Sequence, residues 1–187
     1  MTEEPIIAGD EAPRRHAIDG NWTVIDRCAP EENRVCNEPL PLGRVEGDQL
    51  FEFEPGGTPN EPVSDIEQTH HYVLLQGAPL IAQVETSLID PDQRLASSFH
   101  TYFALDPIEW SDDGQLVAAR IWPILCGPPP QPGEWNHDID SPARHMTNFP
   151  YPGMGEDCLP KDVETLRNAA RESRQYSEDI ELRWAGK

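Results

Sequence analysis

The residues with the clearest chemistry in this sequence are four cysteines, Cys28, Cys36, Cys126 and Cys158. They form no Cys-x-x-Cys pair, which argues against a zinc site with four thiolate ligands. An even number of cysteines among Pro- and Gly-rich segments favours two disulfides. Three pairings are formally open. We expect Cys28–Cys36, which closes a short polar loop, and Cys126–Cys158, which bridges a long proline-rich segment. Four free, buried thiols in a cytosolic protein are the alternative.

A second group of residues with metal-binding chemistry lies inside the proline-rich segment. His137, Asp138, Asp140 and His145 follow Trp135 closely, and imidazole and carboxylate groups are suitable zinc ligands. Their spacing matches no established metal-binding template, and an acidic loop contains such residues without any metal. We therefore predict no metal site.

Catalytic signatures are also missing from the sequence. Ser97 or Ser98, His100 and Asp106 could supply a hydrolytic triad by residue type, but side chains on one strand point in parallel and cannot form the relay. There is no GxGxxG, P-loop, HExxH or GxSxG motif. We predict no cofactor and no catalytic residues, and we favour a protein that is not an enzyme.

The charge of the chain excludes several classes of partner. Its 187 residues include 34 acidic and 14 basic side chains, for a net charge of −20. Such a chain repels nucleic acids and anionic membranes, and no apolar run is long enough to predict a transmembrane segment. Met1–Glu4 is polar and unlike a signal peptide. Because we expect disulfides, we predict a periplasmic or extracellular protein whose leader has been removed.

Alternation of apolar and polar residues predicts mostly β-strands. The expected strands cover 21–26, 51–53, 71–76, 80–86, 95–105, 108–110, 116–125 and 180–184. Asp113-Gly114 favours a tight hairpin turn between two of them, because Asp-Gly readily adopts positive φ angles. The stretch after residue 26 as far as Gly47-Asp48 is rich in turn-forming residues. His70 and His71 begin a strand and are expected to be solvent-exposed on opposite faces, and His100 belongs to a polar face.

These elements indicate one domain with two irregular segments. Residues 1–17 are predicted to be a flexible N-terminal arm, and 18–187 a single β-rich domain. Within it, 127–160 is a long Pro-rich loop, and 161–175 is a helix whose inner stripe is Val163, Leu166, Ala170 and Ser173. The predicted fold is mainly β, an antiparallel barrel or sandwich of about seven strands with one C-terminal helix.

Our first hypothesis for the function is contact with other proteins, by an exported, disulfide-stabilised envelope, surface or assembly component. The Pro-rich loop would supply apolar anchors for a protein partner or for self-assembly, namely Trp135, Phe149, Tyr151 and Met154. The alternative for these side chains is packing against their own sheet.

A different hypothesis comes from Gly20-Asn21-Trp22, which opens the first expected strand. This tripeptide resembles the Gly-x-Trp start of lipocalin-type barrels, whose tryptophan closes one barrel end, and the late helix followed by a short strand is similar to that family's ending. The resemblance implies a small-molecule-binding barrel. Its cavity would be lined by Phe51, Phe53, Phe99, Phe103 and Leu105. A further alternative is a hydrolase of unknown substrate that uses His100 or the His137/His145 loop.

Overall fold

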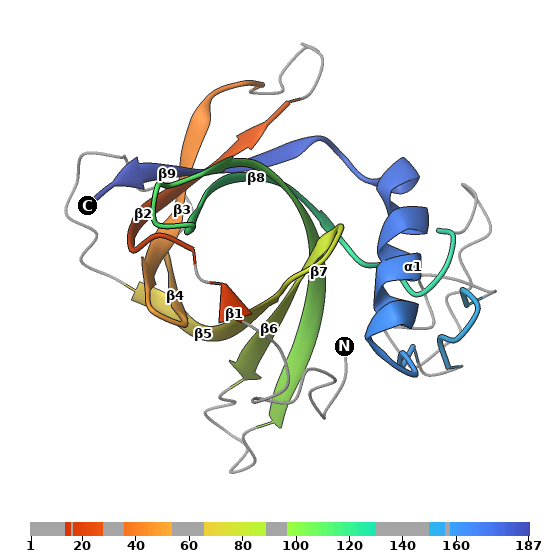
Figure 1. The fold of residues 1–187 in the computed structure, drawn as a ribbon. Helices are drawn as coiled ribbons and strands as arrows, with labels where there is room; N and C mark the ends of the chain where they lie inside the picture. The colour runs from red at the N-terminus through yellow and green to blue at the C-terminus, as the bar shows by residue number, and fades with distance from the viewer. Residues whose placement is uncertain are drawn as a thin grey trace.

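The strands of this protein form one antiparallel sheet that closes on itself. The computed structural model describes residues 14–15, 17–27, 36–53, 66–88, 97–129, 150–155 and 158–187. Within these ranges, eight strands form a closed antiparallel barrel, and one short helix lies outside it (Figure 1). The prediction of a mainly β fold with one C-terminal helix is therefore confirmed, and of the two expected architectures the chain adopts the barrel.

The described strands and helices have the following bounds. They are β1 (Arg14–Arg15), β2 (Gly20–Asp26), β3 (Pro39–Glu46), β4 (Gln49–Phe53), β5 (Ile66–Leu75), β6 (Leu80–Leu88), β7 (Ser97–Trp110), β8 (Leu116–Pro123), α1 (Val163–Ser173), the 3-10 helix η2 (Arg174–Tyr176) and β9 (Ile180–Gly186). From β2 to β9 each strand pairs with the next one in the chain, and β9 pairs with β2 to close the ring. Alternate side chains of each strand consequently face the barrel interior.

The end of the expected N-terminal arm packs against the barrel. Arg14 and Arg15 pair with the last two residues of β5, and Ala17 is buried. The backbone N–H of Ile18 donates to the carbonyl oxygen of Leu116 at 3.0 Å. This segment therefore joins the barrel before residue 18, and the rest of the expected arm lies outside the described residues.

Two strands differ from the sequence prediction. β3, which contains Pro39 and Pro41, occupies part of the stretch that we expected to be turn-rich. Both prolines nevertheless face strand residues of β2, in a pairing that is irregular between Trp22 and Thr23. β7 continues through Pro107, where we expected a break, and its register with β8 shifts at that proline. Register irregularities thus occur next to two of the strand prolines, Pro41 and Pro107.

Helix α1 packs on the outer face of the barrel (Figure 1). Asp162 caps its first turn by accepting a hydrogen bond from the Thr165 backbone N–H at 2.8 Å. Three residues of the predicted inner stripe, Leu166, Ala170 and Ser173, are fully buried, and the fourth, Val163, is partly buried. The indole N–H of Trp122, on β8, donates to the carbonyl oxygen of Ala170 at 2.8 Å. β8 therefore carries apolar side chains on both faces, one toward the interior and one toward the helix.

A disulfide joins Cys126 to Cys158, as expected. Cys36 is also disulfide-bonded, whereas Cys28 lies outside the described residues. The Cys126–Cys158 disulfide links the segment that follows β8 to the segment that precedes α1. In the part of the chain that the structure describes, helices are too short or too polar to cross a membrane.

Candidate ligand-binding cavity

The interior of the barrel contains a cavity of about 310 Å³. Within the described residues, its lining consists of Ala17, Trp22, Leu42, Val45, Leu50, His70, Tyr72, Leu74, Ala82, Val84, Thr101, Phe103, Leu105, Leu116, Ile121 and Leu182. Thirteen of these sixteen side chains are apolar. Because the volume lies at the lower end of the roughly 300–1,000 Å³ found for small-molecule sites, the cavity suits a compact ligand.

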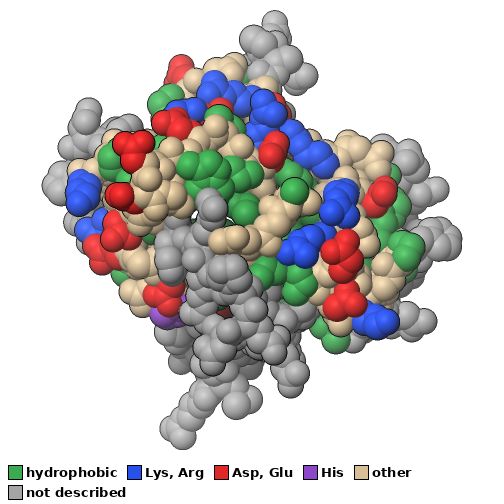
Figure 2. Space-filling model, in the orientation of Figure 1, with side chains coloured by type: hydrophobic (Ala, Val, Ile, Leu, Met, Phe, Trp, Pro, Cys, Tyr) green, Lys and Arg blue, Asp and Glu red, His purple; other side chains and the backbone are tan. Residues whose placement is uncertain are grey.

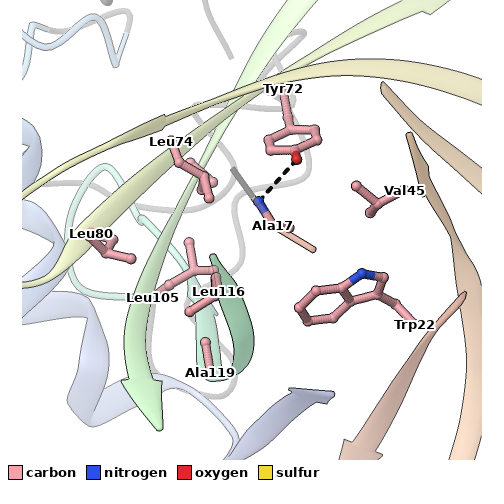
Figure 3. Packing of buried hydrophobic residues seen from close by; sticks show 10 residues of the cluster. Ala17, Trp22, Val45, Tyr72, Leu74, Leu80, Leu105, Leu116 and Ala119 are labelled. Atoms are coloured by element: carbon pink, nitrogen blue, oxygen red, sulfur yellow. Dashed lines mark hydrogen bonds between the residues drawn. The ribbon is translucent and has the colours of Figure 1, made fainter. Parts of the chain in front are cut away.

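Side chains from opposite sides of the barrel point toward one another around this space (Figure 3). Trp22 is 3% exposed and lies at the end of the barrel where β2 begins. Its indole N–H donates to the carbonyl oxygen of Ile18 at 3.0 Å. Together with Ala17, which is also buried, the ring covers this end of the cavity.

Tyr72 fixes the closing segment to the barrel. Its hydroxyl accepts a hydrogen bond from the Ala17 backbone N–H at 3.3 Å and donates one to the Gly47 carbonyl oxygen at 2.8 Å. Burial is the main reason that the pKa of Tyr72 is raised to about 12; the Ala17 hydrogen bond lowers it, and the nearby carboxylates of Asp19 and Asp48 contribute to the rise. The phenol is therefore neutral at physiological pH and serves as a structural hydrogen-bonding group.

Two other polar residues line the cavity, His70 and Thr101. His70 is 5% exposed, whereas its neighbour His71 is exposed. The two histidines thus face opposite sides of β5, as expected, but His70 is buried rather than solvent-exposed. Thr101 pairs with Val84 on β6, which in turn pairs with Tyr72 on β5. His70 and Thr101 therefore project from the two strands that flank β6.

The expected cavity lining can be compared with the observed one. Phe103 and Leu105 line the cavity. Phe51 lies outside the barrel wall, since its neighbour Leu50 points inward and the Arg44 guanidinium lies 5.6 Å from the centre of the Phe51 ring. Our assignment placed Phe51 on the wrong face of its strand, because period-two alternation does not reveal which face is inside. The side chains of Phe53 and Phe99 lie outside the described residues.

The anchors expected for a protein partner are only partly described. Trp135 and Phe149 lie outside the described residues. Tyr151 is 9% exposed, its backbone N–H donates to the Cys126 carbonyl oxygen at 2.8 Å, and burial raises its pKa. Met154 is half-buried, and its backbone N–H donates to the Tyr151 carbonyl oxygen at 2.9 Å. The Tyr151 side chain packs within this chain, near Ser173 of α1 and Tyr176 of η2.

His100, one of the histidines considered for hydrolysis, does not belong to the described lining of this cavity. His100 is 5% exposed and lies on the strand face of Tyr102, which packs beneath α1. It is buried, whereas we expected a polar face. His137 and His145 lie outside the described residues, as do Asp138 and Asp140. Among the described side chains, no group of three or more His, Cys, Asp or Glu residues has metal-binding geometry.

Charged side chains lie on the outer surface of the barrel. Figure 2 shows Lys and Arg side chains gathered over β9 and toward α1. On β9, Glu181 is 6% exposed and accepts hydrogen bonds from Arg27 at 2.9 Å and Arg183 at 2.8 Å. Burial alone would raise the pKa of Glu181, but the two arginines outweigh it and hold the pKa below its ordinary value. This cluster supports the barrel wall from outside.

Comparison with known proteins assigns neither a family nor a function to this cavity. The chain matches no protein-family model, and no curated protein or solved structure shows significant similarity to it. The resemblance to lipocalin-type barrels thus rests on Gly20-Asn21-Trp22 and on the late helix followed by a short strand, and the candidate site must be judged by its own chemistry.

Proposed function

We propose that this protein binds a small, largely apolar molecule inside its barrel. The observation that carries the proposal is the cavity of about 310 Å³ with its apolar lining. A well-packed domain has few voids much larger than a water molecule, and removing side-chain volume from an interior lowers stability. A closed barrel with this unfilled interior is therefore less stable than a fully packed one. Binding of an apolar ligand would stabilise it, because apolar surface of the ligand and of the lining is then buried.

Titration with N-phenyl-1-naphthylamine, an uncharged apolar fluorophore, tests this proposal directly. We expect its fluorescence to rise and saturate at one molecule per chain. Ala82 lines the cavity, so Ala82→Phe fills part of the space and should weaken binding at least tenfold. Ala185 on β9 is exposed, so Ala185→Phe is the matched control and should bind like the wild type.

Two results would contradict the proposal. One is the absence of saturable fluorophore binding to the folded protein. The other is equal binding by the wild type and by a folded Ala82→Phe variant. If Ala82→Phe does not fold, Ala82→Leu makes the same test with a smaller increase in volume. Circular dichroism of each variant establishes that the barrel is intact before binding is compared.

We propose further that the protein works outside the reducing cytoplasm, in a periplasm or extracellularly. Cys126–Cys158 supports this, because disulfides persist mainly in oxidising compartments. Rapid acid quenching of source cells, followed by thiol alkylation and mass spectrometry, should find Cys126 and Cys158 unmodified until reductant is added. Alkylation of both thiols without reductant would argue for a cytoplasmic protein.

A further inference from the structure

The cavity differs from the rest of this acidic protein in its charge. The chain carries a net charge of −20, yet the described lining contains no Asp, Glu, Lys or Arg. An ionised group buried without a counter-ion loses several kcal/mol of solvation, and only a paired charge recovers it. A ligand that enters this space therefore has no described Lys or Arg to neutralise a carboxylate and no described Asp or Glu to neutralise an ammonium.

The lining does offer hydrogen bonds, and they are unevenly distributed. The Tyr72 hydroxyl already bonds Ala17 and Gly47 at the closed end, so a ligand that used it would compete with the contacts that hold this end shut. His70 lies two residues earlier on β5, roughly 6–7 Å further from that end along the strand. Thr101 faces the cavity from β7. His70 and Thr101 are therefore the polar lining residues that do not hold the closed end shut, and they lie on the two strands that flank β6.

We infer that the natural ligand is an uncharged, mainly apolar molecule with a single hydrogen-bonding group, such as an alcohol or a ketone, and that Thr101 and His70 bind this group. The inference rests on the proposed function and makes it more specific. The apolar part of the ligand packs against Trp22, Leu105 and their neighbours at the closed end. Its polar group lies on the β5–β7 side of the cavity.

A series of eight-carbon probes that differ only in the head group tests the ligand class. 1-Octanol, sodium octanoate and octylammonium chloride compete at pH 8 with N-phenyl-1-naphthylamine bound to the full chain. We expect 1-octanol to displace the fluorophore at a concentration at least tenfold lower than either ion, because only the ions lose charge solvation on binding. Equal or tighter binding of octanoate or octylammonium would overturn the inference and leave the proposed function standing.

Failure of 1-octanol to displace bound fluorophore would overturn the inference as well. Failure of the fluorophore itself to bind would instead remove the proposed function, so the two failures are distinguishable.

Conservative variants test which residues bind the head group. Thr101→Val keeps the side-chain shape but removes the hydroxyl, and it should weaken 1-octanol binding about two- to tenfold, the effect of one hydrogen bond. Binding of p-xylene, which has no hydrogen-bonding group, should be unchanged. His70→Leu should act in the same direction. If both folded variants bind 1-octanol like the wild type, this placement of the head group is wrong.

A matched control uses the same substitution outside the cavity. The Thr23 hydroxyl donates to the Arg183 carbonyl oxygen at 3.1 Å, and Thr23 does not belong to the described lining. Thr23→Val therefore removes a hydroxyl of the barrel wall without touching the ligand. It should leave the affinities for 1-octanol and p-xylene unchanged, and an equal loss in both valine variants would show that Thr101 acts only through the stability of the barrel.

Discussion

Gly20 lies directly against the carbonyl oxygen of Gly186. A Cβ at position 20 would lie 2.5 Å from that oxygen and 2.6 Å from the indole nitrogen of Trp184, and the φ angle of Gly20 is +133°. Both observations require glycine, one by space and the other by backbone conformation. The glycine of Gly20-Asn21-Trp22 thus allows β2 and β9 to approach at the closed end, where the tryptophan covers the cavity.

Gly20→Ala should therefore lower the free energy of unfolding by about 2–4 kcal/mol, because the strained backbone and the steric clash add. Gly47 is a matched control, since it also has a positive φ, +63°, but a Cβ there meets no atom within 4 Å. Gly47→Ala should lower the free energy of unfolding by only about 1 kcal/mol. Urea denaturation followed by circular dichroism measures both, and similar losses would contradict the steric argument.

Tyr72→Phe removes the hydroxyl that bonds Ala17 and Gly47, and should lower the free energy of unfolding by about 1–2 kcal/mol at pH 7. The pKa of Tyr72 is raised from 10.0 to about 12 by burial. The resulting stability is complete below pH 10.0 and is lost as the pH rises toward 12. The difference between wild type and variant should therefore shrink above pH 10.

Urea denaturation at pH 7, 10 and 11 checks this convergence. Tyr176 is 44% exposed, so Tyr176→Phe serves as the control and should resemble the wild type at each pH. A constant difference between wild type and Tyr72→Phe over this range would show that the phenol does not titrate as its burial requires.

Several elements of this fold could be predicted from local features of the sequence. The Asp113-Gly114 turn joins β7 to β8, and the helix lies within the expected range, because both signals depend only on neighbouring residues. Strand β6 contains an apolar run because both of its faces are covered. Ile81 points outward and packs under α1, whereas Ala82 points inward and lines the cavity. Such a run is typical of a strand with both faces covered.

The cavity itself could not be located from the sequence. Leu50 and Phe51 are equally apolar neighbours, so only closure of the barrel decides that Leu50 faces inward. His70 gave no signal beyond its strand, since burial depends on residues far away in the chain. β3 was missed because its two prolines argue against a strand when neighbours are considered alone. These errors concern tertiary pairing, which no local pattern contains.

Glu181→Gln should lower the free energy of unfolding at pH 7 by about 1–2 kcal/mol, a modest figure because Arg27 and Arg183 are each more than a third exposed and solvent screens them. The pKa of Glu181 is lowered from 4.5, so the stability from ionised Glu181 is complete above that pH. It is lost as the pH falls through the lower pKa of the folded state.

Thermal or urea unfolding between pH 7 and pH 3 should show a constant difference between wild type and Glu181→Gln down to about pH 5 and a shrinking one below it. Arg44 and Glu46 form an exposed pair on β3. Glu46→Gln should therefore change the free energy of unfolding by less than about 0.5 kcal/mol. A wild-type advantage over Glu181→Gln that grows on acidification would contradict the sign of the shift.

Replacing Cys126 and Cys158 together by alanine should lower the free energy of unfolding by about 3–4 kcal/mol, because the bond spans 32 residues and restricts the unfolded chain. Both cysteines lie outside the described cavity lining. The folded double variant should therefore bind N-phenyl-1-naphthylamine with wild-type affinity while unfolding at lower urea concentration. Loss of binding at urea concentrations at which the variant is still folded would show that the disulfide also shapes the cavity. An unchanged urea midpoint would show that the disulfide does not stabilise the fold.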